Sequence, residues 1–184
     1  MTAGKISYEG SADKDVLYAA VTGVNIAGGW IEDQNGNTLT SSQLVRNDLT
    51  GVYECELYGT TNSFSPGKYV LKYVQNTETL ELVKPNIQWT PIQTFNSAPT
   101  LTWDGISRQL VVSYSQLSGS NVSYYLRIYN SASMLIRETN KFQGPEVSEY
   151  LPQSGNYRVM LIGEVKNADE IVETVRYFFN ERSF

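Results

Sequence analysis

The residue types that most often carry catalysis are scarce in this chain. Its 184 residues include no histidine, the commonest general base and the commonest metal ligand of proteins. Cys55 is the single cysteine, so the chain can form neither an internal disulfide nor a zinc site with several thiolates. Only carboxylate and hydroxyl chemistry is left, and it depends on a fold that brings such groups together.

Two groups of polar side chains have spacings that could carry chemistry. Asp33, Asn35 and Asn37 alternate as calcium ligands do in an EF-hand loop, but the glycine stands at the fourth place instead of the sixth and no Glu occupies the twelfth. The pair Asn35-Gly36 therefore favours a two-residue type I′ hairpin turn. The other group is acidic and is best interpreted as a solvated loop: Glu164, Asp169, Glu170 and Glu173.

Further catalytic signatures are missing from the sequence. There is no glycine-rich phosphate loop, and no Ser-x-x-Lys stands on a predicted helix. We therefore predict a protein that is not an enzyme and that binds no cofactor and no metal. Paired carboxylates of the glycosidase kind stay open as a formal alternative, because such partners need not be neighbours in sequence.

Charge and hydropathy restrict the partners. The net charge is -5, and arginines such as Arg127 and Arg137 are scattered, so we expect no nucleic-acid binding. No apolar run reaches the roughly 18 residues that cross a bilayer, so we expect no membrane insertion. The first residues, MTAGKISYEG, contain no apolar signal core, and the sequence as given predicts no export signal.

The elements that must position any site have the pattern of strands. In GVYECEL, Tyr53, Cys55 and Leu57 fall on one face and two glutamates on the other, which predicts a half-buried strand. Cys55 then points inward as a small hydrophobic residue. A reactive thiol would need a cationic partner, whereas the sequence neighbours of Cys55 are glutamates.

Similar alternating segments recur along the chain and are interrupted once by closely spaced prolines. Pro85, Pro91 and Pro99 cannot all lie in central strands, so a domain boundary is predicted there. Trp89 and Ile92 indicate that this connection packs against a domain. The expected organisation is two domains with a linker: residues 1–84, 85–98 and 99–184.

One predicted strand carries the candidate binding residues. In NVSYYLRIYN, the alternate positions that we expect to face a core are Val122, Tyr124, Leu126 and Ile128. Tyr125, Arg127 and Tyr129 would then form an outward stripe, and tyrosine and arginine are enriched at protein interfaces. The alternative is that these three side chains only pack against neighbouring strands of the same sheet.

The second half resembles a fibronectin type III domain over residues 98–180. QLVVSYSQ and NVSYYLRIYN are similar to its second and third strands, with Tyr114 where that family has a core tryptophan. YLPQSGNYRVMLIGEV resembles the corner in which a buried tyrosine, here Tyr157, bonds to the loop before its strand. SPGKYVLKY echoes SGNYRVML as a weak internal repeat. The first half resembles an immunoglobulin domain through GVYECEL, without the partner cysteine.

These resemblances imply an all-β protein of two consecutive antiparallel β-sandwich domains, immunoglobulin-like and then fibronectin type III-like. The family implies binding, spacing or assembly, and no specific ligand. We expect a structural protein of a virion: a capsid decoration, head fibre or tail-associated component of a phage, assembled in the cytoplasm as part of an oligomer. Its partners would be other protein subunits or a host-surface glycan. The alternative is an extracellular or cell-surface adhesin or a carbohydrate-binding module.

Overall fold

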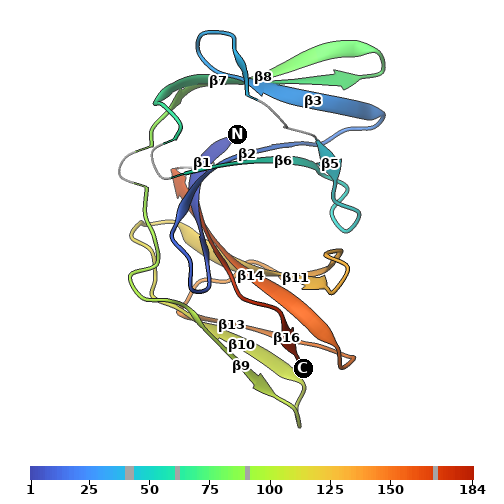
Figure 1. The fold of residues 1–184 in the computed structure, drawn as a ribbon, viewed down its shortest axis with the longest axis vertical. Helices are drawn as coiled ribbons and strands as arrows, with labels where there is room; N and C mark the ends of the chain where they lie inside the picture. The colour runs from blue at the N-terminus through green and yellow to red at the C-terminus, as the bar shows by residue number, and fades with distance from the viewer. Residues whose placement is uncertain (40–43, 61–62, 90–91, 168–169) are drawn as a thin grey trace. The chain divides into compact units, whose positions relative to one another are not determined.

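Antiparallel strands are the regular elements of this protein (Figure 1). The computed structural model describes residues 1–39, 44–60, 63–89, 92–167 and 170–184, and within them no helix occurs. Consequently no described helix is long and apolar enough to span a membrane. The predicted all-β class is confirmed. The chain divides into two compact units: Met1–Gly4 with Lys14–Ile92, and Lys5–Asp13 with Gln93–Phe184.

The first unit is a sandwich of two sheets. β2 pairs with β6 and β6 with β5 in one sheet, and the other has the order β4-β3-β7-β8. The first residues of β1 belong to this unit as well. The strand bounds are β1 Thr2–Tyr8, β2 Lys14–Val21, β3 Ile26–Glu32, β4 Thr38–Leu39, β5 Val45–Arg46, β6 Tyr53–Thr60, β7 Gly67–Gln75 and β8 Glu78–Ile87.

Alternate residues of the two sheets fill the first core. Leu17 and Cys55 enter it from one sheet, Ile31 and Leu71 from the other, and all four are almost completely buried. Cys55 keeps 1 % of its surface exposed, which confirms the predicted inward thiol. Because its side chain is small and surrounded by apolar neighbours, it acts here as a packing residue.

The predicted hairpin exists between β3 and β4, but its turn differs from the expected one. Glu32 pairs with Thr38, so five residues connect the strands instead of two. Gly36 has φ 79° while Asn35 does not have a positive φ, which excludes a type I′ turn. Asp33 explains the difference, because its carboxylate accepts hydrogen bonds from the backbone N–H of Asn35 and of Asn37 at 2.8 and 2.9 Å.

The second unit repeats this architecture. One sheet has the order β9-β10-β13, and the other contains β12-β11-β14-β15, with β16 beside β14. The strand bounds are β9 Thr100–Asp104, β10 Gln109–Ser113, β11 Val122–Asn130, β12 Leu135–Glu138, β13 Glu146–Tyr150, β14 Asn156–Asn167, β15 Glu170–Phe178 and β16 Arg182–Ser183. Its core includes Leu110, Leu126 and Leu161, each with no exposed surface.

Both units distribute their strands between the two sheets in the same chain order. The first two strands enter one sheet, the next two enter the other, the chain returns to the first sheet, and the last strands complete the second: β7 and β8 in the first unit, and β14, β15 and β16 in the second. This is the strand order of immunoglobulin-type sandwiches, in which strands A, B and E face C, F and G. The predicted resemblance between the two halves is thus one of topology.

A tyrosine corner stands at the start of the same strand in both units. The Tyr157 hydroxyl donates to the backbone carbonyl of Gln153 at 3.0 Å, as the resemblance predicts. The Tyr69 hydroxyl donates to the carbonyl of Ser65 at 2.7 Å. Both tyrosines lie four residues beyond their acceptors and reach into the cores of their units. The weak internal repeat in the sequence therefore marks a shared structural device.

The boundary between the units differs in detail from the predicted linker. β8 runs to Ile87, so residues 85–87 lie in a strand, and Trp89 stacks on Phe64 in the first core with centroids 4.9 Å apart. Lys5–Asp13 groups with the second unit, although the sequence predicts that residues 1–84 form one domain. Alternation identifies a strand but not its distant partner, and Glu9 N–H donates to the carbonyl of Phe178 at 2.9 Å.

We predict that Tyr69→Phe and Tyr157→Phe each lower the free energy of unfolding by about 1 kcal/mol, because each change removes one hydrogen bond and leaves a carbonyl without its donor. Tyr150→Phe is the matched control, since Tyr150 is 53 % exposed. Urea unfolding of the four proteins measures the effect. Equal stability of the corner variants and the control would show that the corners contribute nothing.

Candidate functional site

The predicted stripe lies on β11 with the expected facing. Leu126 and Ile128 belong to the core of the second unit, whereas Tyr125, Arg127 and Tyr129 point to the opposite face of the sheet. The alternation seen in the sequence is confirmed. The three stripe residues are therefore neighbours on one sheet face.

Their exposure differs from the expectation. Tyr125 is 7 % exposed and Arg127 is 5 % exposed, and Tyr129 is half-buried. Met160 and Ile162 of β14 are the cross-strand partners of Arg127 and Tyr125, and both are buried too. The expectation of an open, solvent-facing stripe is wrong for Tyr125 and Arg127, because both side chains are buried.

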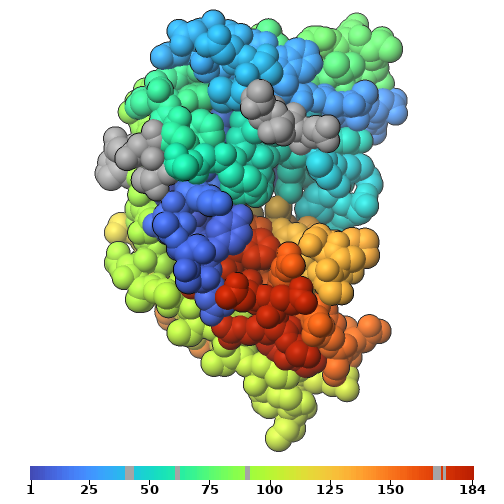
Figure 2. Space-filling model, viewed as in Figure 1, coloured from blue at the N-terminus to red at the C-terminus, as the bar shows by residue number. Residues whose placement is uncertain are grey.

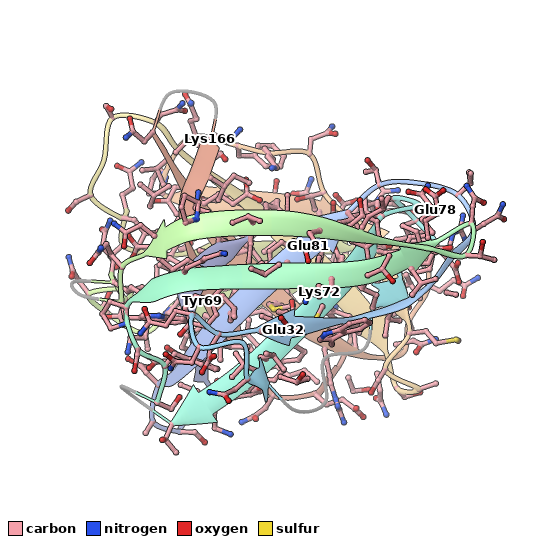
Figure 3. The ribbon with its side chains drawn as sticks, turned by 90° about the horizontal axis from the view of Figure 1, so that it is seen from above. Glu32, Tyr69, Lys72, Glu78, Glu81 and Lys166 are labelled. Atoms are coloured by element: carbon pink, nitrogen blue, oxygen red, sulfur yellow. The ribbon has the colours of Figure 1, made fainter. Side chains whose placement is uncertain are left out.

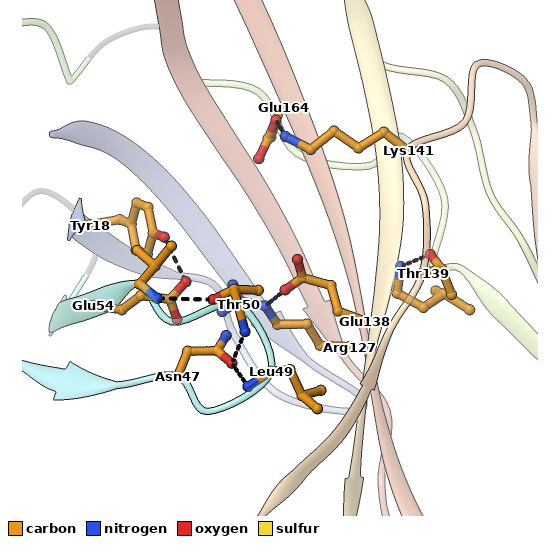
Figure 4. A network of polar contacts seen from close by, with 12 residues as sticks. Tyr18, Asn47, Leu49, Thr50, Glu54, Arg127, Glu138, Thr139, Lys141 and Glu164 are labelled. Carbon is orange, nitrogen blue, oxygen red and sulfur yellow. Dashed lines mark hydrogen bonds and ion pairs between the residues drawn. The ribbon is translucent and has the colours of Figure 1, made fainter. Parts of the chain in front are cut away.

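Charged neighbours engage the first two stripe residues. Arg127 Nε lies 2.7 Å from Glu138 Oε2 of β12, its register partner (Figure 4). Lys141 Nζ lies 5.3 Å from the centre of the Tyr125 ring, within the range of a cation–π contact. The same ammonium group pairs with Glu164 of β14 at 2.5 Å (Figure 4). Anions and cations on this face therefore compensate one another.

The third stripe residue belongs to an aromatic stack. The Tyr129 ring stacks on Phe178 of β15 with centroids 5.7 Å apart, and Tyr8 stacks on Phe178 at 5.8 Å. Such offset pairs add stability beyond the buried area alone. The contacts of all three stripe residues match the packing alternative, and the stripe as an interface stays a prediction.

A second surface, which the sequence analysis did not identify, is the outer face of the four-stranded sheet in the first unit. We name it the outer sheet face and define it by two cross-strand rows on β3, β7 and β8: Trp30, Lys72 and Glu81, and Glu32, Val70 and Val83. Figure 3 shows Glu32, Lys72 and Glu81 in line across the three strands. The sequence carried only a partial signal: in KYVLKYV, Tyr69, Leu71 and Tyr73 form an apolar face, whereas the other face alternates lysine with valine.

Ion pairs and one indole fix the charged part of this face. Lys72 Nζ lies 2.9 Å from Glu32 Oε2 and 3.6 Å from Glu81 Oε1, and the Trp30 indole N–H donates to Glu32 Oε1 at 2.8 Å. The hydrogen bonds from Trp30 and then Lys72 lower the pKa of Glu32. The hydrogen bond to Glu32 raises the pKa of Lys72. Glu32 and Lys72 therefore both stay charged at neutral pH.

Apolar surface lies beside this charged row. Val83 is 45 % exposed and is the cross-strand partner of Val70. Other exposed apolar side chains lie both on strands, such as Val45 of β5 and Ile136 of β12, and at loops. Ile106, 97 % exposed, lies at the β9–β10 turn, which protrudes in yellow-green in Figure 2. The outer sheet face thus combines the Glu32–Lys72–Glu81 ion pairs with one exposed aliphatic side chain, Val83.

Acidic side chains that the sequence analysis considered for chemistry accept hydrogen bonds from neighbouring residues. Glu173 accepts a hydrogen bond from the backbone N–H of Gln93, and burial raises the pKa of its carboxyl. Hydrogen bonds from Asn37 lower the pKa of Asp33. Asp169 lies outside the described residues. Among the residues that the structure describes, no group of three His, Cys, Asp or Glu side chains could hold a metal ion.

Three surface depressions in the described part of the chain do not combine two acids either. Their volumes are about 140, 280 and 320 Å³, and each depression contains at most one carboxylate among its lining residues. Glycoside hydrolysis of the usual kind needs a pair of carboxyl groups on opposite sides of the bond. These depressions therefore lack the geometry of that reaction.

No protein-family model and no curated protein matches the chain. Among solved structures it is similar to a cytokine receptor complex, with 11 % identity, a TM-score of 0.37, and coverage of 99 % of this chain and 94 % of that one. A structure of domains from titin has 9 % identity, a TM-score of 0.34, and coverage of 99 % and 61 %. The BSP domain of a biofilm associated protein has 12 % identity and a TM-score of 0.33, with coverage of 90 % of this chain and 27 % of that one. At these scores the likenesses carry no argument about function.

The strand order and the two tyrosine corners define the class of this protein. It is an all-β chain with two antiparallel sandwich units of the immunoglobulin-like and fibronectin type III-like kind. This class describes the fold, and function has to be argued from the surfaces.

We predict that Arg127→Ala lowers the free energy of unfolding by about 3 kcal/mol, because it leaves Glu138 without its partner in a largely buried pair. The control is Arg137→Ala on the same strand pair, since the Arg137 side chain is 59 % exposed in its ion pair with Glu149. That change should cost less than about 1 kcal/mol. Urea unfolding measures the free energy of unfolding of both variants. Equal losses of stability would contradict a buried, structural role for Arg127.

Proposed function

We propose that this chain is a non-catalytic structural and assembly protein, an accessory component of a phage virion. In this proposal it decorates a capsid, forms part of a head fibre or belongs to a tail, and its partners are other protein subunits of an oligomeric assembly. The observation that carries the proposal is the outer sheet face, a flat surface whose charged groups are already paired with one another.

The composition of the outer sheet face supports contact with protein. Protein interfaces combine an apolar, aromatic-containing centre with a polar rim. Val83 and the half-buried Trp30 supply the apolar and aromatic part, and the Glu32–Lys72–Glu81 ion pairs supply fixed charges. Because these charged side chains are held before any partner arrives, ordering them adds little to the entropy cost of binding.

The lone thiol supports assembly in a reducing compartment. Cys55 is buried, and both sandwiches pack cores without a disulfide between their sheets. Disulfides are rare in proteins that fold in the cytoplasm, where virion components are assembled before release. The proposed location is therefore the virion, after assembly in the cytoplasm.

A second function, an extracellular or cell-surface adhesin or a carbohydrate-binding module, is favoured by a different observation. The loops of the second unit enclose a polar depression of about 280 Å³ that no charged side chain lines. An uncharged hydrogen-bonding site suits a neutral ligand better than a protein surface. The two functions involve different units of the chain, so separate variants distinguish them.

Val83→Glu tests the assembly function. A charge placed among the aliphatic side chains of the outer sheet face should reduce incorporation into particles about tenfold, because an interfacial carboxylate without a partner costs more than about 1.4 kcal/mol. Val24→Glu is the matched control at a 69 % exposed position in the β2–β3 loop. The measurement is the number of tagged copies per particle isolated from the native source.

Two outcomes would contradict the proposal. If Val83→Glu and Val24→Glu enter particles as the parent does, the outer sheet face is not the contact. If the tagged parent itself is absent from particles, the chain is not an assembly component.

A further inference from the structure

Two loops of the second unit form the walls of a depression of about 280 Å³. One loop connects β10 to β11 and supplies Gln116 and Ser120, and the other connects β12 to β13 and supplies Gln143. The floor includes Leu117 and Tyr124. The volume lies below the roughly 300–1,000 Å³ of pockets for drug-sized ligands, which limits an occupant to about one sugar-sized ring.

Tyr124 anchors both walls. Its hydroxyl accepts the backbone N–H of Leu117 at 2.6 Å, which fixes the first loop. Its backbone N–H and carbonyl exchange hydrogen bonds with Phe142 at 2.9 and 2.8 Å, which fixes the second loop. Because Tyr124 is 1 % exposed, this anchor is part of the core, and the walls are held before any ligand binds.

Two further contacts hold the first loop. The side-chain amide of Gln93 forms two hydrogen bonds with the backbone of Ser118. Its Oε1 accepts from the Ser118 N–H at 2.6 Å, and its Nε2 donates to the Ser118 carbonyl at 2.8 Å. Below the loop, a Cβ at Gly163 would lie 2.7 Å from Leu117 Cδ1 and 3.2 Å from Tyr124 Cε1, so only glycine leaves room for both side chains there. The loop is therefore positioned from above and below.

The chemistry of the lining selects the ligand. The lining residues include no Asp, Glu, Lys or Arg, so phosphate, sulfate and carboxylate groups would find no countercharge. Lys141, two residues before Gln143, is engaged with Glu164 at 2.5 Å. Side-chain amides offer both donors and acceptors, as a neutral polyhydroxylated ligand requires.

One aromatic side chain belongs to the lining. The Tyr124 ring is 1 % exposed and forms part of the floor. The buried Tyr124 ring leaves no stacking platform inside the depression for a nucleobase.

We propose that this depression is a binding site for a neutral saccharide unit, recognised by the Gln116 and Gln143 amides and the Ser120 hydroxyl. The inference rests on the second proposed function, carbohydrate binding, and names its ligand class and residues; it holds whether or not the chain enters a particle. A single shallow site binds weakly, and several copies in one oligomer would raise the avidity.

The test is binding of the full chain to an immobilised panel of neutral oligosaccharides with terminal glucose, galactose, mannose or N-acetylglucosamine, beside sialylated and sulfated glycans. We expect binding to a neutral group, and about a tenfold loss in the double variant Gln116→Ala/Gln143→Ala, which removes two hydrogen-bonding side chains. Gln153→Ala, at an exposed position on the β13–β14 loop, is the matched control and should bind as the parent does.

Because Gln116 and Gln143 are exposed, the double variant should unfold in urea as the parent does, which separates loss of binding from loss of fold. The proposal is overturned if no neutral glycan binds, if only sialylated or sulfated glycans or peptides bind, or if the double variant binds like the parent. None of these outcomes affects the particle incorporation that tests the assembly function.

Discussion

A tyrosine hydroxyl bonded to a backbone carbonyl four residues earlier fixes the start of the long central strand in each unit. Tyr69 and Tyr157 do this at equivalent places in two sandwiches with the same strand order. The constraint matters because side chains alternate between faces, so a slip of one residue would place every core side chain of that strand on the wrong face. With these strands fixed, the inner faces fill with aliphatic and aromatic side chains, and the polar chemistry is confined to outer faces and loops.

Local patterns predicted much of this fold. Alternation placed Cys55 in a core and located the β11 side chains on the correct faces, and the Gly-x-Tyr echo marked both corners. What the sequence could not predict depends on partners far away in the chain. Arg127 was expected in solvent, and Glu138 of the neighbouring strand pairs with it. On the outer sheet face, Lys72 of β7 pairs with Glu32 of β3, and no local sequence pattern predicts that these two residues are neighbours.

Two clusters of charged groups in this protein are internally paired, whereas the depression in the second unit is lined by neutral groups. On the face of the β11 sheet that carries Tyr125 and Arg127, the cation of Lys141 forms an ion pair with the carboxylate of Glu164. On the outer sheet face, Lys72 lies between two glutamates. Groups held in this way stabilise and present a surface, because their charges are already compensated. The depression between the two loops differs, since its amides are exposed and no charge lines it. This division is the basis of the two proposals, protein contact for the first unit and binding of a small neutral ligand for the second.

The central claim is that the chain works as a passive component of a larger assembly. Mass analysis of the intact protein complex from the native source tests it most directly, because it reports partners and copy number without altering the chain. We predict a fixed number of copies bound to other subunits of a larger particle. A free monomer, or a fragment of a longer exported chain, would contradict the account.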